Sequence, residues 1–165
     1  MTVNTIMTRE ITMLRPEDPV RKGLEMMHRK RVRNLPVVNH DGSFAGLFGI
    51  RQVVHLLLPK AAQIKGGLTD LSFMPDDYGD VYHRVLEVGD RPVSEFLEPG
   101  ENLLICEPGT PIPEVLELLN QSFYTSLPVL VLDDDATTLT GMVSGWDVLE
   151  KLVMNVFNHS GSDAR

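Results

Sequence analysis

Cysteine is almost absent from this chain, since Cys106 is the only one among 165 residues. A single cysteine excludes an internal disulfide, and its place in the apolar run 103–106 indicates a buried strand. A reducing compartment fits this composition. No stretch approaches the roughly 18 consecutive apolar residues of a membrane-spanning helix, and residues 1–4 have no signal-peptide pattern. We therefore expect a cytoplasmic protein that has no membrane partner.

Positive charge is scarce as well. The 15 Lys and Arg residues are outnumbered by 23 Asp and Glu residues, which gives a formal net charge of −8 at pH 7. Nucleic-acid-binding proteins present a basic face, so this balance argues against a nucleic-acid partner. The basic residues are unevenly distributed, however, because six of them lie between Arg21 and Arg33. Such a segment on an acidic protein is suited to holding a small anion.

The sequence patterns of common catalytic and metal sites are also missing. The five histidines are scattered without metal-ligand spacing, and neither a serine nor the cysteine lies in a nucleophile motif. No glycine-rich phosphate loop of the P-loop type is present. We therefore expect no catalytic residue, no metal site and no enzymatic activity.

What the chain does contain is an internal repeat, which is the first feature to establish because it decides the fold. Three pairs of segments match under a shift of 92 residues, which becomes 95 after an acidic turn that is three residues longer in the second copy: 14–20 with 106–112, 35–38 with 127–130, and 46–48 with 141–143. Both copies contain a Leu-Pro-Val run and a Gly-apolar-apolar run in the same order. Chance is a poor explanation for this agreement.

Each copy predicts the same plan, β-α-β-β-α. The first helix begins in both copies with a capping residue followed by proline, Asp18-Pro19 and Thr110-Pro111. The predicted strands are 12–14, 35–38 and 44–48 in the first copy, and 103–106, 127–132 and 139–143 in the second. One copy alone buries its apolar faces poorly. The predicted fold class is therefore α+β, with two repeats packed sheet to sheet around a pseudo-twofold axis.

The repeats divide the chain into four parts. Residues 1–58 are the first repeat, 59–92 an ordered insertion, 93–157 the second repeat and 158–165 a flexible tail. Within the insertion we predict a helix over 80–88. Three aromatic residues make the insertion too apolar for a free linker, so we expect it to pack on the repeats or on a partner: Phe73, Tyr78 and Tyr82.

One segment, 141–149, carries a polar pair where a strand runs into a helix. The helix start presents free amide hydrogens and a positive dipole end, which suit phosphate. Ser144 can donate to a phosphate oxygen, and Asp147 can accept from both hydroxyls of a ribose. The competing interpretation is a capping box that needs no ligand. The first copy has Gly49 and Gln52 at the equivalent positions, which favours a single intact site.

The basic segment 29–34 is the second candidate. Cations at the end of a helix are favourable without any ligand, and this explains Arg29 and Lys30. Arg33 abuts the predicted buried run 35–37, near the expected groove between the copies. A phosphate contact and a solvated position both remain open for Arg33.

The repeated plan, the Leu-Pro-Val strand and the ending Gly-apolar-apolar-Ser-x-x-Asp resemble the CBS domain, the family named for cystathionine β-synthase. The resemblance covers nearly all of the chain except 59–92. It implies a Bateman module, in which clefts between two repeats bind AMP, ADP, ATP or S-adenosylmethionine as regulatory ligands rather than cofactors. The nucleotide-binding residues that the resemblance implies are Ser144 on phosphate, Asp147 on ribose, Arg33-Asn34 toward the phosphates, and Ile105, Cys106 and Val143 around adenine.

The resemblance also implies a function and an assembly. We expect a stand-alone regulatory module that senses an adenine ligand and signals to a separate partner. A ligand-free dimerisation or scaffold module is the alternative. The helices near 115–119 and 148–153 carry more apolar residues than one core face needs, which predicts a homodimer. At the first cleft, Thr125-Ser126 carries no charge where the other copy has Arg33-Asn34, so no phosphate clamp is expected there.

Overall fold

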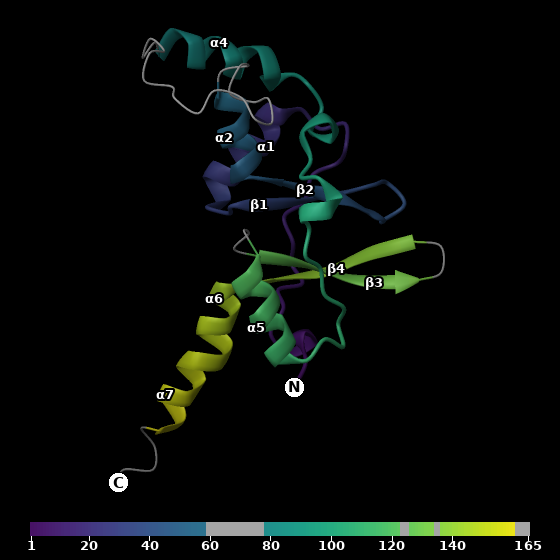
Figure 1. Ribbon diagram of the computed structural model, residues 1–165, viewed down its shortest axis with the longest axis vertical. Coiled ribbons are helices and arrows are strands. Elements are labelled where there is room, and N and C mark those ends of the chain that lie inside the picture. The colour runs from purple at the N-terminus through teal and green to yellow at the C-terminus, as the bar shows by residue number, and fades with distance from the viewer. Residues whose placement is uncertain (59–77, 123–125, 134–135, 161–165) are drawn as a thin grey trace.

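The computed structural model describes residues 1–58, 78–122, 126–133 and 136–160. Two β-hairpins lie in the middle of the molecule, one above the other, with helices on their outer sides (Figure 1). The first repeat comprises α1 Val20–Lys30, β1 Asn34–Val38, β2 Phe44–Gly49 and α2 Ile50–Leu57. The second comprises α5 Ile112–Gln121, β3 Ser126–Asp133, β4 Ala136–Ser144, α6 Gly145–Val148, the π-helical η4 Leu149–Val153 and α7 Met154–Ser160. The α+β prediction is confirmed.

The two hairpins have the same register. Leu35 lies opposite Phe48 in the first hairpin, and Leu127 lies opposite Val143 in the second. Each hairpin has one irregularity, between Val37 and Val38 in β1 and at the equivalent step of β3. The hairpins contact each other through an isolated bridge between Ser43, which precedes β2, and Thr138 of β4.

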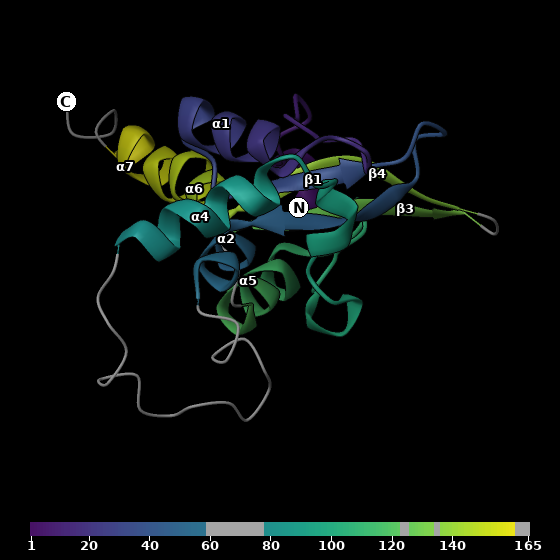
Figure 2. The ribbon, with the colours of Figure 1, turned by 90° about the horizontal axis from the view of Figure 1, so that it is seen from above.

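The helices form two opposite faces (Figure 2). Viewed from above, α1 lies on the same face as α6 and α7, whereas α2 and α5 lie on the other. Each face therefore combines a helix from one repeat with a helix from the other. This arrangement brings the basic end of α1 to the face on which α6 begins.

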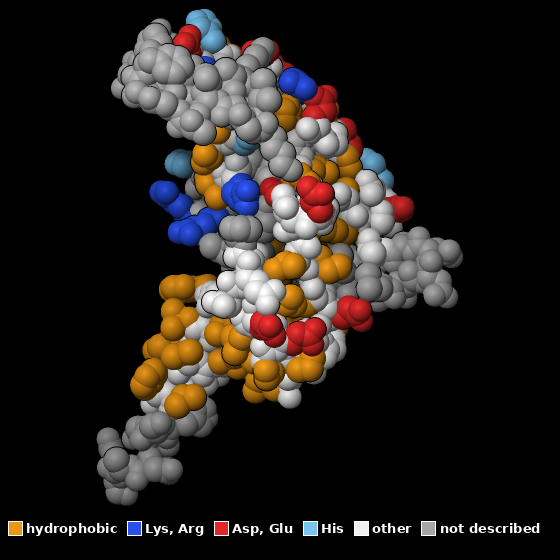
Figure 3. Space-filling view, viewed as in Figure 1, with side chains coloured by type: hydrophobic (Ala, Val, Ile, Leu, Met, Phe, Trp, Pro, Cys, Tyr) orange, Lys and Arg blue, Asp and Glu red, His pale blue; other side chains and the backbone are white. Residues whose placement is uncertain are grey.

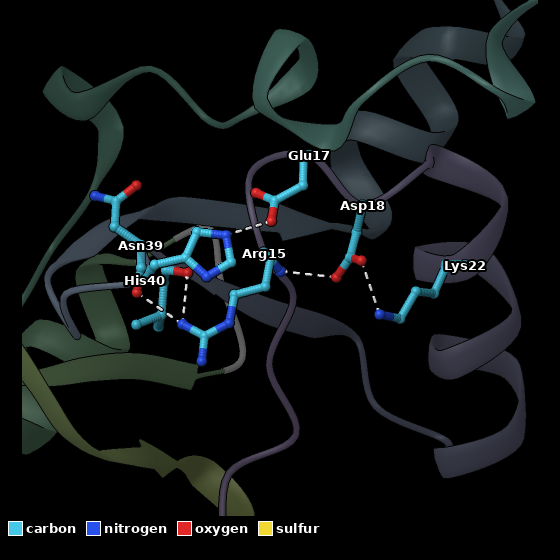
Figure 4. A network of polar contacts seen from close by, with 7 residues as sticks. Arg15, Glu17, Asp18, Lys22, Asn39 and His40 are labelled. Atoms are coloured by element: carbon cyan, nitrogen blue, oxygen red, sulfur yellow. Dashed lines mark hydrogen bonds and ion pairs between the residues drawn. The ribbon is translucent and has the colours of Figure 1, made fainter.

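The predicted strand 12–14 shrinks to a single residue. Leu14 N donates to Pro36 O and Leu14 O accepts from Val38 N, both at 2.9 Å. The next donor of such a ladder would be the N–H of residue 16, but Pro16 has none. Arg15 replaces it, because its Nη1 donates to the carbonyl oxygens of Val38 and Asn39 at 3.0 and 2.7 Å (Figure 4). In the second repeat, the strand predicted over 103–106 is likewise reduced to a bridge at Cys106, two residues before Pro108.

The predicted capping residues close a turn before the helix instead of capping the helix itself. Asp18 Oδ2 accepts from Arg15 N at 2.8 Å, and Thr110 Oγ1 accepts from Glu107 N at 2.9 Å. Helices α1 and α5 begin one residue after Pro19 and Pro111, which serve as N-caps. A proline therefore precedes the first helical residue instead of occupying it.

The turn before α1 is held further by an ion pair and by a contact between a histidine and a carboxylate (Figure 4). Lys22 Nζ lies 2.8 Å from Asp18 Oδ1, and His40 Nε2 lies 2.5 Å from Glu17 Oε1. The latter pair joins the turn before α1 to the turn between β1 and β2. His40, Glu17 and Lys22 are exposed, so we expect both contacts to contribute little to stability.

Each repeat is completed by a segment that precedes the other repeat. The N-terminal segment, which includes η1 Val3–Thr5, lies beside α5 (Figure 1), where Val3 N donates to Thr110 O at 2.9 Å. The segment around η2 Val93–Phe96 lies on the first repeat, where Val93 N donates to Asp18 O at 2.8 Å. A shift of 90 residues places Val3 on Val93. We call residues 3–8 and 93–98 the crossing segments.

Two apolar cores result, and both contain residues from a crossing segment. The first comprises Leu14, Val20, Met27, Leu35, Val37, Phe48, Leu56 and Val93. The second comprises Val3, Ile6, Met7, Cys106, Ile112, Val115, Leu127 and Val143. After the second crossing segment, a single turn, η3 Gly100–Asn102, leads toward α5.

The predicted helix of the insertion is confirmed as α4 Tyr78–Gly89. It packs against α1 and α2 on the outer side of the first repeat (Figure 1). Its Val88 contacts the first core, whereas Tyr82 is exposed. Phe73 and the rest of 59–77 lie outside the described residues.

Candidate ligand-binding site

The polar pair of the second repeat forms a complete capping box at the start of α6. Ser144 N and Ser144 Oγ donate to Asp147 Oδ2 at 2.8 and 2.7 Å, and Asp147 N donates back to Ser144 Oγ at 3.3 Å. The first copy lacks the hydroxyl for this arrangement. The capping interpretation of the motif is therefore correct in geometry, and a ligand role would have to use the same atoms.

The other oxygen of Asp147 is bound by two further side chains. Thr8 Oγ1 donates to Asp147 Oδ1 at 2.9 Å, and Lys151 Nζ lies 3.2 Å from it. Lys151 Nζ also donates to Ile6 O at 2.5 Å. Thr8 and Ile6 belong to the crossing segment, so the site joins residues almost at opposite ends of the chain.

Asp147 stays ionised although it is buried. Burial alone would raise the pKa of this carboxyl, but hydrogen bonds from Ser144, Thr8 and Lys151 stabilise the charged form and hold the pKa below its usual range. The residue is 8% exposed. An ionised carboxylate is a stronger hydrogen-bond acceptor than a neutral carboxyl group.

Beyond Asp147 the helix widens into a π-turn over Leu149–Val153, where Met154 N donates to Leu149 O five residues back. Single π-turns occur often at functional sites. Here Lys151 lies within the widened turn. Like Asp147, which binds Thr8, it ties this helix to the crossing segment.

The first repeat has a similar hydrogen-bonded group at the equivalent place, but its carboxylate comes from a different position in the repeat. Gln52 Oε1 accepts from Gly49 N at 3.0 Å, as Asp147 does from Ser144. Gln52 Nε2 donates to Glu98, and Asn102 Nδ2 donates to the other oxygen of Glu98 at 2.8 Å. Glu98 is 6% exposed. The first repeat therefore also contains a buried carboxylate, but it comes from the crossing segment.

A cavity of about 420 Å³ opens beside this group. Its lining includes Arg51, Gln52 and His55 from α2, Phe96 and Glu98 from the crossing segment, and Asn102. The prediction that the first cleft lacks a phosphate clamp rested on Gly49, Gln52 and Thr125-Ser126, and did not consider these lining residues. Thr125 lies outside the described residues.

Arg33 and Asn34 do not contact Ser144 or Asp147 in the hydrogen bonds that the structure describes. Arg33 is exposed, and its carbonyl accepts from Ile50 N at 2.9 Å. Asn34 is buried at the start of β1, opposite Gly49. Basic side chains gather on this side of the first repeat, above an indentation that separates them from the hydrophobic surface of the α6–α7 helix (Figure 3). Among the hydrogen bonds that the structure describes, none joins the basic segment to the start of α6.

The three residues predicted around adenine differ in exposure. Val143 and Cys106 are buried in the second core, so only their backbone is available to a ligand. Burial raises the pKa of the Cys106 thiol to about 11, which makes it unreactive. Ile105 is 39% exposed and presents its side chain at the surface.

Among the described residues, no group of three or more His, Cys, Asp or Glu is placed to hold a metal ion. Within the same residues, no helix is long and apolar enough to cross a membrane.

The repeat, the crossing segments and the two capping groups agree with a comparison against protein-family models. The CBS domain model matches residues 3–59 and 93–154. The chain belongs to the CBS domain family. Both matches of this CBS protein begin at a crossing segment, at Val3 and Val93, and so include the segments that pack on the opposite repeat.

Known proteins resemble this CBS protein in sequence and in fold. It is 41% identical over 61 residues to the CBS domain-containing protein CBSX2, chloroplastic, of Arabidopsis thaliana, which covers 37% of this chain and 24% of CBSX2. It is 28% identical over 151 residues to the human 5′-AMP-activated protein kinase subunit gamma-3, which covers 89% of this chain and 25% of that subunit. The matches thus span about a quarter of each curated relative.

Two solved structures share the fold. The crystal structure of CBSX2 in complex with AMP has a TM-score of 0.66 at 18% identity, covering 94% of this chain and 98% of that one. The CBS domain pair of protein MJ0100, in complex with 5′-methylthioadenosine and S-adenosyl-L-methionine, has a TM-score of 0.60 at 12% identity, covering 97% of this chain and 98% of that one.

Sequence reasoning missed three residues of these sites: Thr8, Lys151 and Glu98. The 90-residue shift that aligns Val3 with Val93 also aligns Thr8 with Glu98, and it would have located both. For Lys151, the helical spacing of four residues from Asp147 was available in the sequence.

Proposed function

We propose that this CBS protein is a regulatory module that binds an adenine-containing ligand at Ser144 and Asp147 and senses it without transforming it. The observation that carries the proposal is the buried, ionised carboxylate of Asp147 beside a hydroxyl at a helix start. Such a carboxylate suits the two hydroxyls of a ribose, and the helix start suits phosphate. The first repeat has no hydroxyl at the equivalent position, Gly49.

The relatives support the ligand class. CBSX2 has been crystallised with AMP, and the MJ0100 domain pair with 5′-methylthioadenosine and S-adenosylmethionine. All of these ligands carry adenosine with an intact ribose diol. We propose AMP, ADP, ATP or S-adenosylmethionine as the ligand, with Arg33 reaching the phosphates across the indentation from the basic end of α1. Backbone groups of Cys106 and Val143 and the side chain of Ile105 would flank the adenine.

Isothermal titration with AMP, ATP and S-adenosylmethionine tests this proposal. Asp147→Asn keeps the shape of the side chain but removes the charged acceptor, which costs about 1.5–3 kcal/mol, so affinity should fall roughly tenfold or more. Arg33→Met should weaken AMP and ATP, and should reduce their salt dependence. Glu150→Gln, an exposed change on the same helix, is the matched control and should bind normally. Wild-type protein that binds none of the ligands, or an unchanged affinity in folded Asp147→Asn, would contradict the proposal.

The second candidate, a ligand-free scaffold, is favoured by a specific observation. Both oxygens of Asp147 accept hydrogen bonds from donors of the chain itself, so the motif has a structural role without a ligand. In that case Asp147→Asn would reduce stability, and neither the wild type nor the variant would bind any of the ligands. Thermal unfolding with and without each ligand separates the two candidates, because a specific ligand raises the unfolding temperature by mass action.

We further propose a homodimer that is built on the α6–α7 helix. Large apolar side chains are exposed along it: Trp146, Leu149, Val153, Met154, Val156 and Phe157. An exposed apolar surface of this kind marks an interaction site. Light scattering should give the mass of a dimer for the wild type, and a monomer for Val153→Asp combined with Phe157→Asp. Glu150→Asp serves as the control, and a wild-type monomer at micromolar concentration would contradict the dimer.

A further inference from the structure

The carboxylate of Asp147 has no acceptor position left for a ligand. An ionised carboxylate offers about four lone-pair positions on its two oxygens. Four donors already use them: Ser144 N and Ser144 Oγ on Oδ2, and Thr8 Oγ1 and Lys151 Nζ on Oδ1. A ribose diol needs two of these positions, so two of the present donors must leave when it binds.

The backbone decides which donors can leave. Ser144 N is part of the helix start and cannot move away without unwinding α6. The backbone of Thr8 is held, because its N–H donates to Met142 O at 2.8 Å and its carbonyl accepts from Met142 N at 2.9 Å. Its hydroxyl can still rotate about one bond, but among the described hydrogen bonds it has no acceptor other than Asp147 Oδ1. Ser144 Oγ needs only a rotation about one bond, and that rotation turns it toward a phosphate.

Lys151 is the remaining donor that can leave. Its bond to Asp147 is the longest of the four, at 3.2 Å, and its side chain is 36% exposed. Its ammonium keeps a second acceptor in Ile6 O, so it can leave Oδ1 and remain hydrogen-bonded. Ser144 Oγ and Lys151 Nζ are therefore the donors that leave most readily, and a diol needs two positions.

We propose that Lys151 is an internal competitor for Asp147, a positioning residue that occupies the place of one ribose hydroxyl and sets how strongly the site discriminates for a vicinal diol. This inference rests on the proposed function. Lys151 keeps the carboxylate ionised and oriented while it holds Oδ1, and the ligand must displace it. A ligand with a single hydroxyl can use the position released by Ser144 and need not displace Lys151.

The test compares AMP with 2′-deoxy-AMP, which has the same phosphate and base but one hydroxyl fewer. The measured quantity is the ratio of the two dissociation constants, because effects of the lysine charge on the phosphate cancel in it. In Lys151→Met, AMP has one donor fewer to displace, whereas 2′-deoxy-AMP, whose single hydroxyl uses the Ser144 position, gains nothing. The preference for AMP over 2′-deoxy-AMP should therefore rise about fivefold, the equivalent of one net hydrogen bond of about 1 kcal/mol. Lys151→Arg restores a charged donor and should restore the wild-type ratio.

Two further variants serve as controls for this test. Lys22→Met removes a lysine that pairs with an aspartate four residues away, as Lys151 does, but at a distant site, and should leave the ratio unchanged. Lys151→Gln retains a donor for Ile6 O if the methionine variant folds poorly, and should also raise the ratio.

An unchanged or lower ratio in both neutral variants would overturn the role of Lys151 while leaving nucleotide binding intact. Absence of AMP binding to the wild type would instead overturn the proposed function, and this inference with it.

Discussion

Thr8 and Glu98 occupy equivalent places in the two halves of the molecule. Thr8 N donates to Met142 O at 2.8 Å, and Glu98 N donates to Leu47 O at 2.9 Å. Each side chain then reaches the third residue of the helix that follows, Asp147 or Gln52. One repeat pairs a hydroxyl with an acid and the other pairs an acid with an amide. The carboxylate has thus been kept at both sites while its position in the chain has changed.

The first prediction concerns Glu98. Glu98→Ala leaves the amide of Gln52 buried without its acceptor, which should lower the free energy of unfolding by about 2–3 kcal/mol. Combining it with Gln52→Ala should cost less than the sum of the single changes, because the two side chains contact each other. Urea unfolding of the four proteins measures this coupling.

Glu95→Ala is the matched control for Glu98. Glu95 lies three residues earlier and pairs with Arg91 across exposed surface, so its loss should change stability by less than about 0.5 kcal/mol. Equal losses in Glu95→Ala and Glu98→Ala would show that the buried carboxylate has no special role.

The second prediction concerns the close approach of the first crossing segment to β4. A Cβ at Gly141 would lie 2.7 Å from Met7 Sδ and 3.1 Å from Thr8 O. Gly141→Ala must displace a buried side chain and press on backbone, so it should cost about 1–3 kcal/mol. Gly145→Ala is the control, because a Cβ there meets nothing within 4 Å, and we expect it to be neutral or stabilising. Thermal unfolding that destabilises both variants equally would refute the contact.

Much of this fold follows from the spacing of apolar residues and from the proline, glycine and turn residues that separate the elements. The hairpin strands, the helices and α4 were all predictable, because each repeats a local pattern that a second copy confirms. The crossing segments were not predicted, since residues 3–8 have no pattern that says which core they join. The first strand was predicted too long at its beginning, since residues 12 and 13 do not pair and only Leu14 bridges to β1.

The candidate site was predicted in part. Ser144 and Asp147 are a local motif, and the structure brings them together. Their other partners come from elsewhere, as Thr8 lies 139 residues from Asp147. A contact over such a separation depends on the packing of the crossing segment, which the single motif does not encode. Arg33 and Asn34 make no described hydrogen bond to Ser144 or Asp147.

The third prediction concerns the single thiol. With a pKa of about 11, Cys106 has far less thiolate at pH 8 than a free cysteine, whose pKa is about 8.5. This difference should slow alkylation of the folded protein by more than about tenfold, and burial in the second core should slow it further. Mass spectrometry after a timed iodoacetamide pulse at pH 8, with and without denaturant, measures the ratio. Labelling of the native protein at the rate of the unfolded chain would contradict the buried position.

The last prediction is a pH dependence that Asp147 imposes on stability. Its pKa in the folded protein lies below its usual range, whereas in the unfolded chain it returns to about 3.9. A lowered folded-state pKa means that the ionised group contributes its full stability above about pH 3.9 and loses it as the pH falls through that value toward the folded-state pKa. Asp147→Asn should therefore be less stable than the wild type by about 1–2 kcal/mol at pH 7, and the difference should shrink as the pH is lowered below about 4. Urea unfolding of both proteins between pH 7 and pH 3 gives this difference directly, and Glu150→Gln should follow the wild type throughout. Other carboxyls with lowered pKa values, such as Asp18, affect both proteins alike and cancel from the comparison. A difference that stays constant down to pH 3 would mean that Asp147 stabilises α6 through its shape rather than its charge, and would remove the ionised acceptor on which ribose binding depends.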